Sequence, residues 1–110
     1  MRDTKHKSDI RRLVVNIVEF VDDHQPGRVA CTLIDARGTQ HRFVDKVPIF
    51  TSEHLDKKNT YPRSGLVRCT VLDEWLDSGN ELVRVSTAIP DDVESTSGIS
   101  EFVVFAQQLS

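Results

Sequence analysis

Apolar residues of this chain recur at every second position or in short runs, and clusters of turn-forming residues separate the runs. An alternation of period two is typical of β-strands, because successive side chains of a strand point to opposite faces. No long segment repeats with the 3.6-residue period of a helix. We therefore predict an all-β domain with six antiparallel strands, at residues 12–22, 28–35, 39–47, 66–75, 81–87 and 100–106.

Two short turns are predicted to join neighbouring strands as hairpins. Residues 35–38 read Asp-Ala-Arg-Gly, in which the aspartate favours a type I turn and the glycine supplies a positive φ. Residues 77–80 read Asp-Ser-Gly-Asn, a second cluster of strong turn formers. Hairpins at both places favour an antiparallel arrangement over a parallel one.

The first and last predicted strands carry apolar residues on both faces. We expect these two strands to pair and to close the sheet into a small six-stranded antiparallel barrel, since closure removes open edges. A partly open barrel of the oligonucleotide-binding type, or a sandwich, is the alternative. In strand number and size the chain resembles the small β-barrel domains appended to translation factors. It carries no motif of those domains, so the resemblance implies a fold and no function.

A long connection separates the third strand from the fourth. Pro48 ends the third strand because proline has no N–H to donate, and we expect a short helical turn near residues 51–58 with Thr51 or Ser52 as its N-cap. Long ordered connections often carry function. Aromatic residues and arginine are enriched at binding hot spots, so we predict a partner-binding patch composed of Phe50, His54, Tyr61 and Arg63. The alternative is that the apolar members plug one end of the barrel.

The chain has 110 residues and a net charge of −3, which suits a single domain. We assign that domain to residues 11–107, after a flexible basic leader at residues 1–10. Residues 1–12 hold five basic and two acidic groups (5 − 2 = +3), and the remainder holds nine and fifteen (9 − 15 = −6). An acidic body repels phosphate, so nucleic acid is a disfavoured partner.

Several features indicate a cytoplasmic protein without membrane contact. No apolar run approaches the roughly 18 residues needed to span a bilayer, and the first residues lack the apolar segment of a secretory signal. Cys31 and Cys69 each lie mid-strand among apolar neighbours. We predict that both are buried, reduced core residues.

No catalytic, metal or cofactor site is predicted. The sequence has no GxSxG elbow, no HExxH and no paired Cys/His spacing. His41 lies on a predicted strand and is interpreted as a satisfied side chain rather than a base. Two acidic clusters are interpreted as a turn and as a solvated loop, because their spacing lacks that of an EF-hand: Asp22, Asp23 and His24, and Asp91, Asp92 and Glu94.

These observations favour a non-enzymatic interaction module whose partner is another protein, with inhibitor, immunity-type and accessory roles left open. A second copy of the chain is a further candidate partner. The alternative is a barrel that binds single-stranded nucleic acid through aromatic and basic side chains on one face: Phe43, Phe50, Tyr61 and Trp75, with Arg42, Lys46, Arg63 and Arg68. A small enzyme is disfavoured because no nucleophile and base are paired in the sequence.

Overall fold

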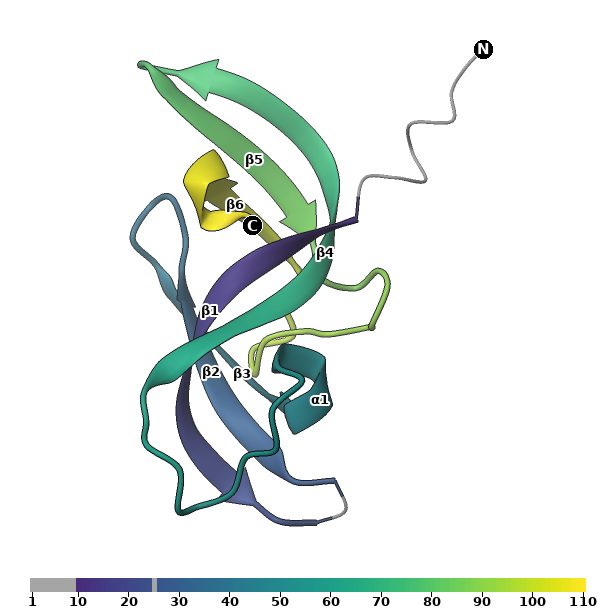
Figure 1. Ribbon diagram of the computed structural model, residues 1–110. Helices are drawn as coiled ribbons and strands as arrows, with labels where there is room; N and C mark the ends of the chain where they lie inside the picture. Colours follow the sequence, from purple (N-terminus) through teal and green to yellow (C-terminus); the bar gives the residue numbers. More distant parts are fainter. Residues whose placement is uncertain (1–9, 25) are drawn as a thin grey trace.

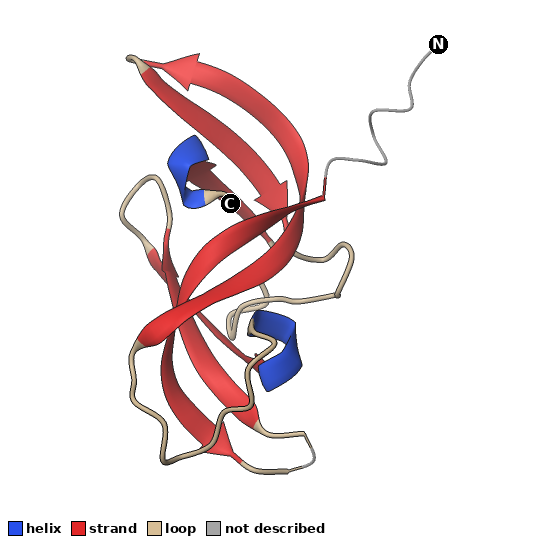
Figure 2. Cartoon of the chain, viewed as in Figure 1, coloured by secondary structure: helices blue, strands red, loops and turns tan. Residues whose placement is uncertain are grey.

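A computed structural model describes residues 10–24 and 26–110, and it confirms the all-β prediction (Figure 1). The six strands lie within a few residues of the predicted positions, and Figure 2 shows how little of the chain is helical. The elements are β1 (Ile10–Asp22), β2 (Arg28–Ile34), β3 (Gln40–Lys46), α1 (Val47–Phe50), β4 (Arg63–Asp77), β5 (Asn80–Ser86), β6 (Glu101–Phe105) and the 3-10 helix η2 (Ala106–Gln108). Of the predicted leader, only Ile10 belongs to the described residues, and it begins β1.

The strands form one antiparallel sheet in the order β3-β2-β1-β4-β5-β6, and this sheet curls into a half-barrel (Figure 1). β1 pairs with β2 on one side and with β4 on the other, while β6 pairs with β5. The expected pairing of the first strand with the last is therefore wrong. Both hydrogen-bonding edges of β1 are taken by its hairpin neighbour and by the long strand β4, so β3 and β6 become the edges of the sheet.

The two sheet edges approach each other without forming a ladder. The Ala36 amide donates to the Val103 carbonyl at 2.8 Å, and the Thr96 amide donates to the Arg42 carbonyl at 2.7 Å. Inside, the Phe43 ring on β3 meets the Phe102 ring on β6 edge-on, with centroids 5.6 Å apart. Isolated hydrogen bonds and aromatic contacts of Phe102 thus cover the edges, which matches the partly open alternative.

The chain end returns to the first strand after β6. The Ser110 amide donates to the Arg12 carbonyl at 2.7 Å, and Leu13 and Leu109 form an isolated β-bridge. The Gln108 side chain donates to the Ile34 carbonyl at 2.9 Å. The end of the chain therefore meets β1, although β6 itself does not.

One apolar core fills the inside of the curled sheet and includes side chains from all six strands. Cys31 and Cys69 are free thiols with no exposed surface, as predicted. Burial raises the pKa of Cys31 to about 12 and the pKa of Cys69 to about 11. Both thiols are therefore protonated at neutral pH and act as small apolar side chains.

The helical turn lies earlier in the connection than predicted. α1 spans Val47–Phe50, directly after β3, with Pro48 in its first turn. Proline suits that position because its missing N–H would have no partner there and its fixed φ is already helical. Thr51 is the C-cap instead of the N-cap, and its hydroxyl accepts the Glu53 amide at 3.1 Å. Neither helix within the described ranges is long and apolar enough to cross a membrane.

Gly65 on β4 lets α1 pack close to the sheet. A Cβ atom at this position would lie 2.8 Å from Cδ1 of Ile17 and 3.2 Å from the backbone oxygen of Phe50. The first contact is too short for two carbon atoms, so a larger residue would push β4 away from β1 or from α1. The absence of a side chain here seats the start of the connection on the barrel.

Candidate functional site

The predicted partner-binding patch does not form one continuous surface, because Phe50 is buried. Its ring is 2% exposed and belongs to the core cluster. Phe50 therefore supports the connection from within and cannot be a surface anchor, which agrees with the alternative interpretation of a plug. The remaining three residues of the patch lie on the connection itself or at its end.

Tyr61 and Arg63 hold the connection together. The Tyr61 ring packs against the core, its hydroxyl donates to the Asp56 carbonyl at 2.8 Å, and burial raises its pKa. The Arg63 guanidinium donates to the Glu53 carboxylate at 2.7 Å. Both side chains thus have intramolecular partners, and their role in binding stays a prediction.

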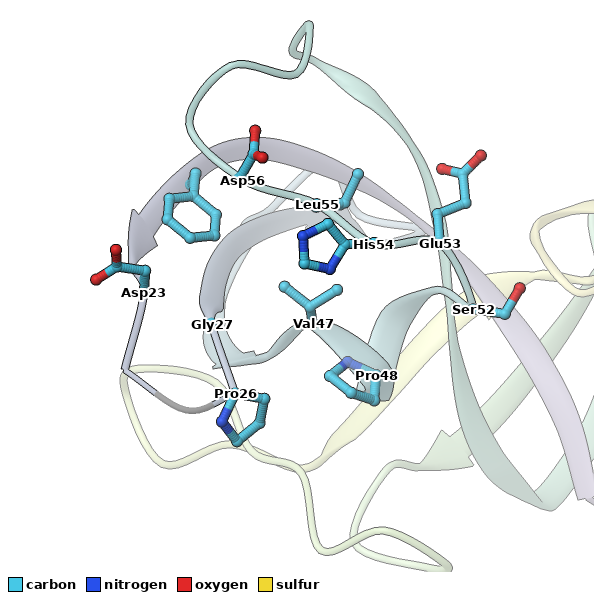
Figure 3. Close-up of a pocket in the computed structure, with 11 residues that line it drawn as sticks. Asp23, Pro26, Gly27, Val47, Pro48, Ser52, Glu53, His54, Leu55 and Asp56 are labelled. Atoms are coloured by element: carbon cyan, nitrogen blue, oxygen red, sulfur yellow. The ribbon is translucent and has the colours of Figure 1, made fainter.

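His54 is exposed and lines a cleft of about 530 Å³ between the connection and the β1–β2 turn (Figure 3). The apolar lining of the cleft includes Phe20, Val47 and Leu55, and the polar lining of the cleft includes Asp23, Glu53 and Asp56. Ligand sites usually combine such an apolar surface with a few buried polar groups that fix orientation. None of the polar side chains that line this cleft is buried, so it offers contact area without a built binding chemistry.

His41 has the structural role that its strand position predicted. Its Nε2 lies 2.8 Å from Oδ2 of Asp35, and its ring meets Phe102 edge-on at 4.8 Å. Asp35 also accepts the backbone amides of Arg37 and Thr39, at 2.9 and 3.0 Å. The pair thus ties the β2–β3 turn to β6.

The acidic cluster at residues 91–94 is solvated at Asp92 and Glu94, which are exposed as predicted, whereas Asp91 is partly buried and paired. Asp91 accepts two hydrogen bonds from Arg68, at 2.7 and 3.0 Å, and Val93 is buried. The buried Thr87 hydroxyl donates to the Val93 carbonyl at 2.7 Å, which fixes the loop between β5 and β6. At the other cluster, Asp22 forms a turn bond to the His24 amide and an ion pair with Arg28. No group of three metal-ligating side chains occurs in the described parts of the chain.

The structure does not assemble the patch predicted for nucleic acid. Phe43 and Phe50 are buried, so their rings cannot stack on bases. Three of the four basic candidates are paired with carboxylates: Arg42 with Glu19, Arg63 with Glu53, and Arg68 with Asp91. Each pair leaves less net positive charge to attract phosphate.

The β4–β5 hairpin is a surface that the sequence analysis did not single out. It projects past the body of the half-barrel (Figure 1). β4 has 15 residues, and the described part of β1, which begins at Ile10, pairs with its first half, up to Thr70. Leu72, Trp75 and Leu76 on this hairpin are 40%, 38% and 71% exposed. Residues 71–82 hold four acidic residues and no basic one, a charge of −4: Asp73, Glu74, Asp77 and Glu81. We refer to residues 71–82 as the hairpin surface.

A shallow apolar groove borders the hairpin surface. Trp75 pairs with Leu82, and Leu82 pairs with Phe105, so the three side chains form a row across β4, β5 and β6. The row lies on the sheet face opposite the core, since Val83 and Val104 next to it point inward. Ala36 and Arg37 from the β2–β3 turn form the other wall of this groove of about 440 Å³.

Trp75 was predicted as a stacking candidate for nucleic acid and was not included in the predicted partner-binding patch. The sequence feature that could have indicated this surface is a short segment in which a tryptophan and two leucines are interspersed with acidic residues. Whether those apolar side chains are exposed depends on how far β1 pairs along β4, which the sequence alone does not show. Comparison with protein-family models, with curated proteins and with solved structures finds no match to this chain. The geometry alone therefore supports the functional proposal.

Proposed function

We propose that the protein is a non-enzymatic interaction module that binds a basic surface of another protein through its hairpin surface. The observation that carries this proposal is that Trp75, Leu72 and Leu76 are exposed on a projecting element whose residues 71–82 include four acidic residues and no basic one. Tryptophan is among the residues most enriched at binding hot spots, and clustered exposed apolar side chains commonly mark interaction sites.

The two kinds of side chain have separate tasks in this proposal. The charge of −4 on residues 71–82 attracts a basic partner over a distance comparable to the Debye length, about 8–10 Å in physiological salt, and so raises the rate of association. The apolar side chains bind only at contact, where their burial keeps dissociation slow. The same charge repels nucleic acid, which ranks that alternative second.

Site-specific photo-cross-linking in the native host tests the proposal. We would place p-benzoylphenylalanine at Leu76, and at Ser97 on the loop between β5 and β6 as a control, since both positions are exposed. We expect a discrete adduct with a protein from position 76 and none from position 97. Trp75→Ala should remove the adduct, and the purified partner should bind this variant at least about tenfold more weakly.

Two results would contradict the proposal. A partner that cross-links from the connection, at His54, and not from position 76 would return the contact surface to the predicted patch. A nucleic acid recovered in place of a protein, with binding that survives Trp75→Ala, would favour the alternative function.

A further inference from the structure

In the described part of the chain, no strand pairs with the outer edge of β4 along the hairpin surface. Within the described residues, β1 pairs with β4 from Ile17↔Arg63 to Ile10↔Thr70, and residues 71–77 then pair with β5 alone. Every second residue of a strand directs its N–H and C=O groups away from a given neighbour. An open edge of this kind is a template for another strand.

The Glu74 amide has a local partner on its own strand. It donates to the side-chain oxygen of Asp73 at 2.9 Å. A local carboxylate thus satisfies a donor that an added strand could use. Asp73 can release that amide by a side-chain rotation, so it protects the edge without blocking it.

We infer that the open edge of β4, residues 71–77, receives an extended strand rich in lysine or arginine from the partner, which adds to the sheet. This inference rests on the proposed function and specifies how the partner binds. Strand addition derives affinity from main-chain hydrogen bonds and specificity from alternate side chains. Here Trp75 and Leu76, neighbours in sequence, offer apolar contacts on opposite faces of the added strand.

Charge determines which strand fits. Asp73, Glu74 and Asp77 all lie within the open segment, and like charges on neighbouring strands are destabilising. A second copy of the chain, paired antiparallel at this edge, would bring three carboxylates from each strand to one seam. A strand with lysine or arginine at alternate positions would instead place cations beside those carboxylates.

The test uses the full-length protein and a synthetic peptide as long as the open segment, with alternating lysine and valine and with blocked ends. Trp75 is the single tryptophan, so its fluorescence reports binding at this edge. A second peptide of the same sequence is N-methylated at every second residue, which removes the N–H donors from one of its edges. We expect saturable binding of the first peptide and binding at least about tenfold weaker for the second.

Two charge variants locate the contact. Glu74→Lys should weaken binding of the unmodified peptide by about tenfold or more, since it replaces an attraction with a repulsion. Glu94→Lys makes the same change of charge at an exposed position on the β5–β6 loop and should bind like the unsubstituted protein. Equal losses in both variants would mean that only the net charge matters and would overturn the inference.

Three further results would overturn strand addition. Equal affinity for both peptides would show that only side chains contribute to binding. No binding of either peptide would show that the edge does not accept such strands. In both cases a cross-link from position 76 to a partner protein would still support the proposed function. A full-length variant, Lys5→Glu with Lys7→Glu, tests whether this chain's own basic residues compete for the edge. A tenfold rise in its peptide affinity would assign the edge to them instead of to a partner.

Discussion

At the scale of single residues, burial controls the chemistry of the two thiols. Cys31 and Cys69 have no exposed surface, and their pKa values of about 12 and 11 leave almost no thiolate at neutral pH. The thiolate is the reactive form of cysteine. Their contribution to the protein is therefore packing, which makes polar substitution costly.

Cys69→Ser is expected to lower the free energy of unfolding by about 1–3 kcal/mol, because its hydroxyl would be buried in an apolar site. Chemical denaturation of both proteins measures the loss. A thiol reagent should label the unsubstituted protein slowly in native buffer and rapidly in denaturant. Rapid labelling of both cysteines in native buffer would contradict their burial.

At the scale of elements, the turn of the β4–β5 hairpin has a local conformational requirement. Ser78 and Gly79 both have positive φ, 53° and 86°, as the two central residues of a type I′ turn do. Glycine adopts this conformation freely and asparagine adopts it more readily than serine. Gly79 therefore suits the positive φ of its turn position, and Ser78 suits the positive φ of its own position less well.

Ser78→Asn should raise the free energy of unfolding by a few tenths of a kcal/mol, on the order of the left-handed preference of asparagine. Gly79→Ala should lower it by roughly 1 kcal/mol, because alanine is strained at positive φ although no atom lies near the added methyl group. Thermal denaturation of the two variants provides the comparison. A more stable Gly79→Ala variant would show that the turn adopts another conformation.

The connection between α1 and β4 separates a structural role from a binding role. Phe50→Ala should destabilise the protein by about 3–5 kcal/mol, since it empties a core site. Arg63→Ala breaks only a partly exposed ion pair with Glu53 and should change the melting temperature little. If the predicted patch takes part in binding, Tyr61→Ala and Arg63→Ala should each weaken partner affinity by about 1 kcal/mol or more. Unchanged affinity in both would leave the connection a purely structural element.

At the scale of the whole molecule, paired carboxylates make stability depend on acid. The hydrogen bond from Arg28 lowers the pKa of Asp22 from 3.8 to about 2, and the hydrogen bonds from Arg68 lower the pKa of Asp91. Burial raises the pKa of Asp35, but the bonds from His41 and two backbone amides outweigh it and leave a lowered value. A carboxylate with a lowered folded-state pKa stabilises the fold above its unfolded pKa and loses that effect as the pH falls through the folded value.

The melting temperature should therefore change little from about pH 7 to pH 5 on account of these groups and then fall as the pH drops from about 4 towards 2. Asp91→Asn removes one of these carboxylates. The melting temperature of this variant should therefore be lower at pH 7 and should fall by a smaller amount between pH 4 and pH 2. Calorimetry from pH 2 to pH 7 measures both curves. Parallel curves would show that the Asp91–Arg68 pair contributes nothing to the acid dependence.

Charge pairing also limits what the molecule attracts. Five arginines form ion pairs with carboxylates: Arg28, Arg42, Arg63, Arg68 and Arg84. We expect the full-length protein to bind single-stranded oligonucleotides weakly at low salt, and deletion of residues 1–9 to abolish the remainder. Fluorescence anisotropy measures both. Tight binding by the truncated protein would promote the nucleic-acid alternative over the protein partner.

Local patterns in the sequence determined the strands, the two hairpins and the buried cysteines, because alternation and turn chemistry act over a few neighbouring residues. Strand order was decided only by tertiary structure, since residues far apart in the chain, such as Ile10 and Thr70, must meet to define it. The same holds for the position of Phe50 in the core and for the pairing of Asp91 with Arg68. The exposure of Trp75 belongs to this second group as well. The residues of the hairpin surface are visible in the sequence, but only the tertiary pairing of β1 with β4, which among the described residues ends at Ile10 and Thr70, places them at an edge of the sheet.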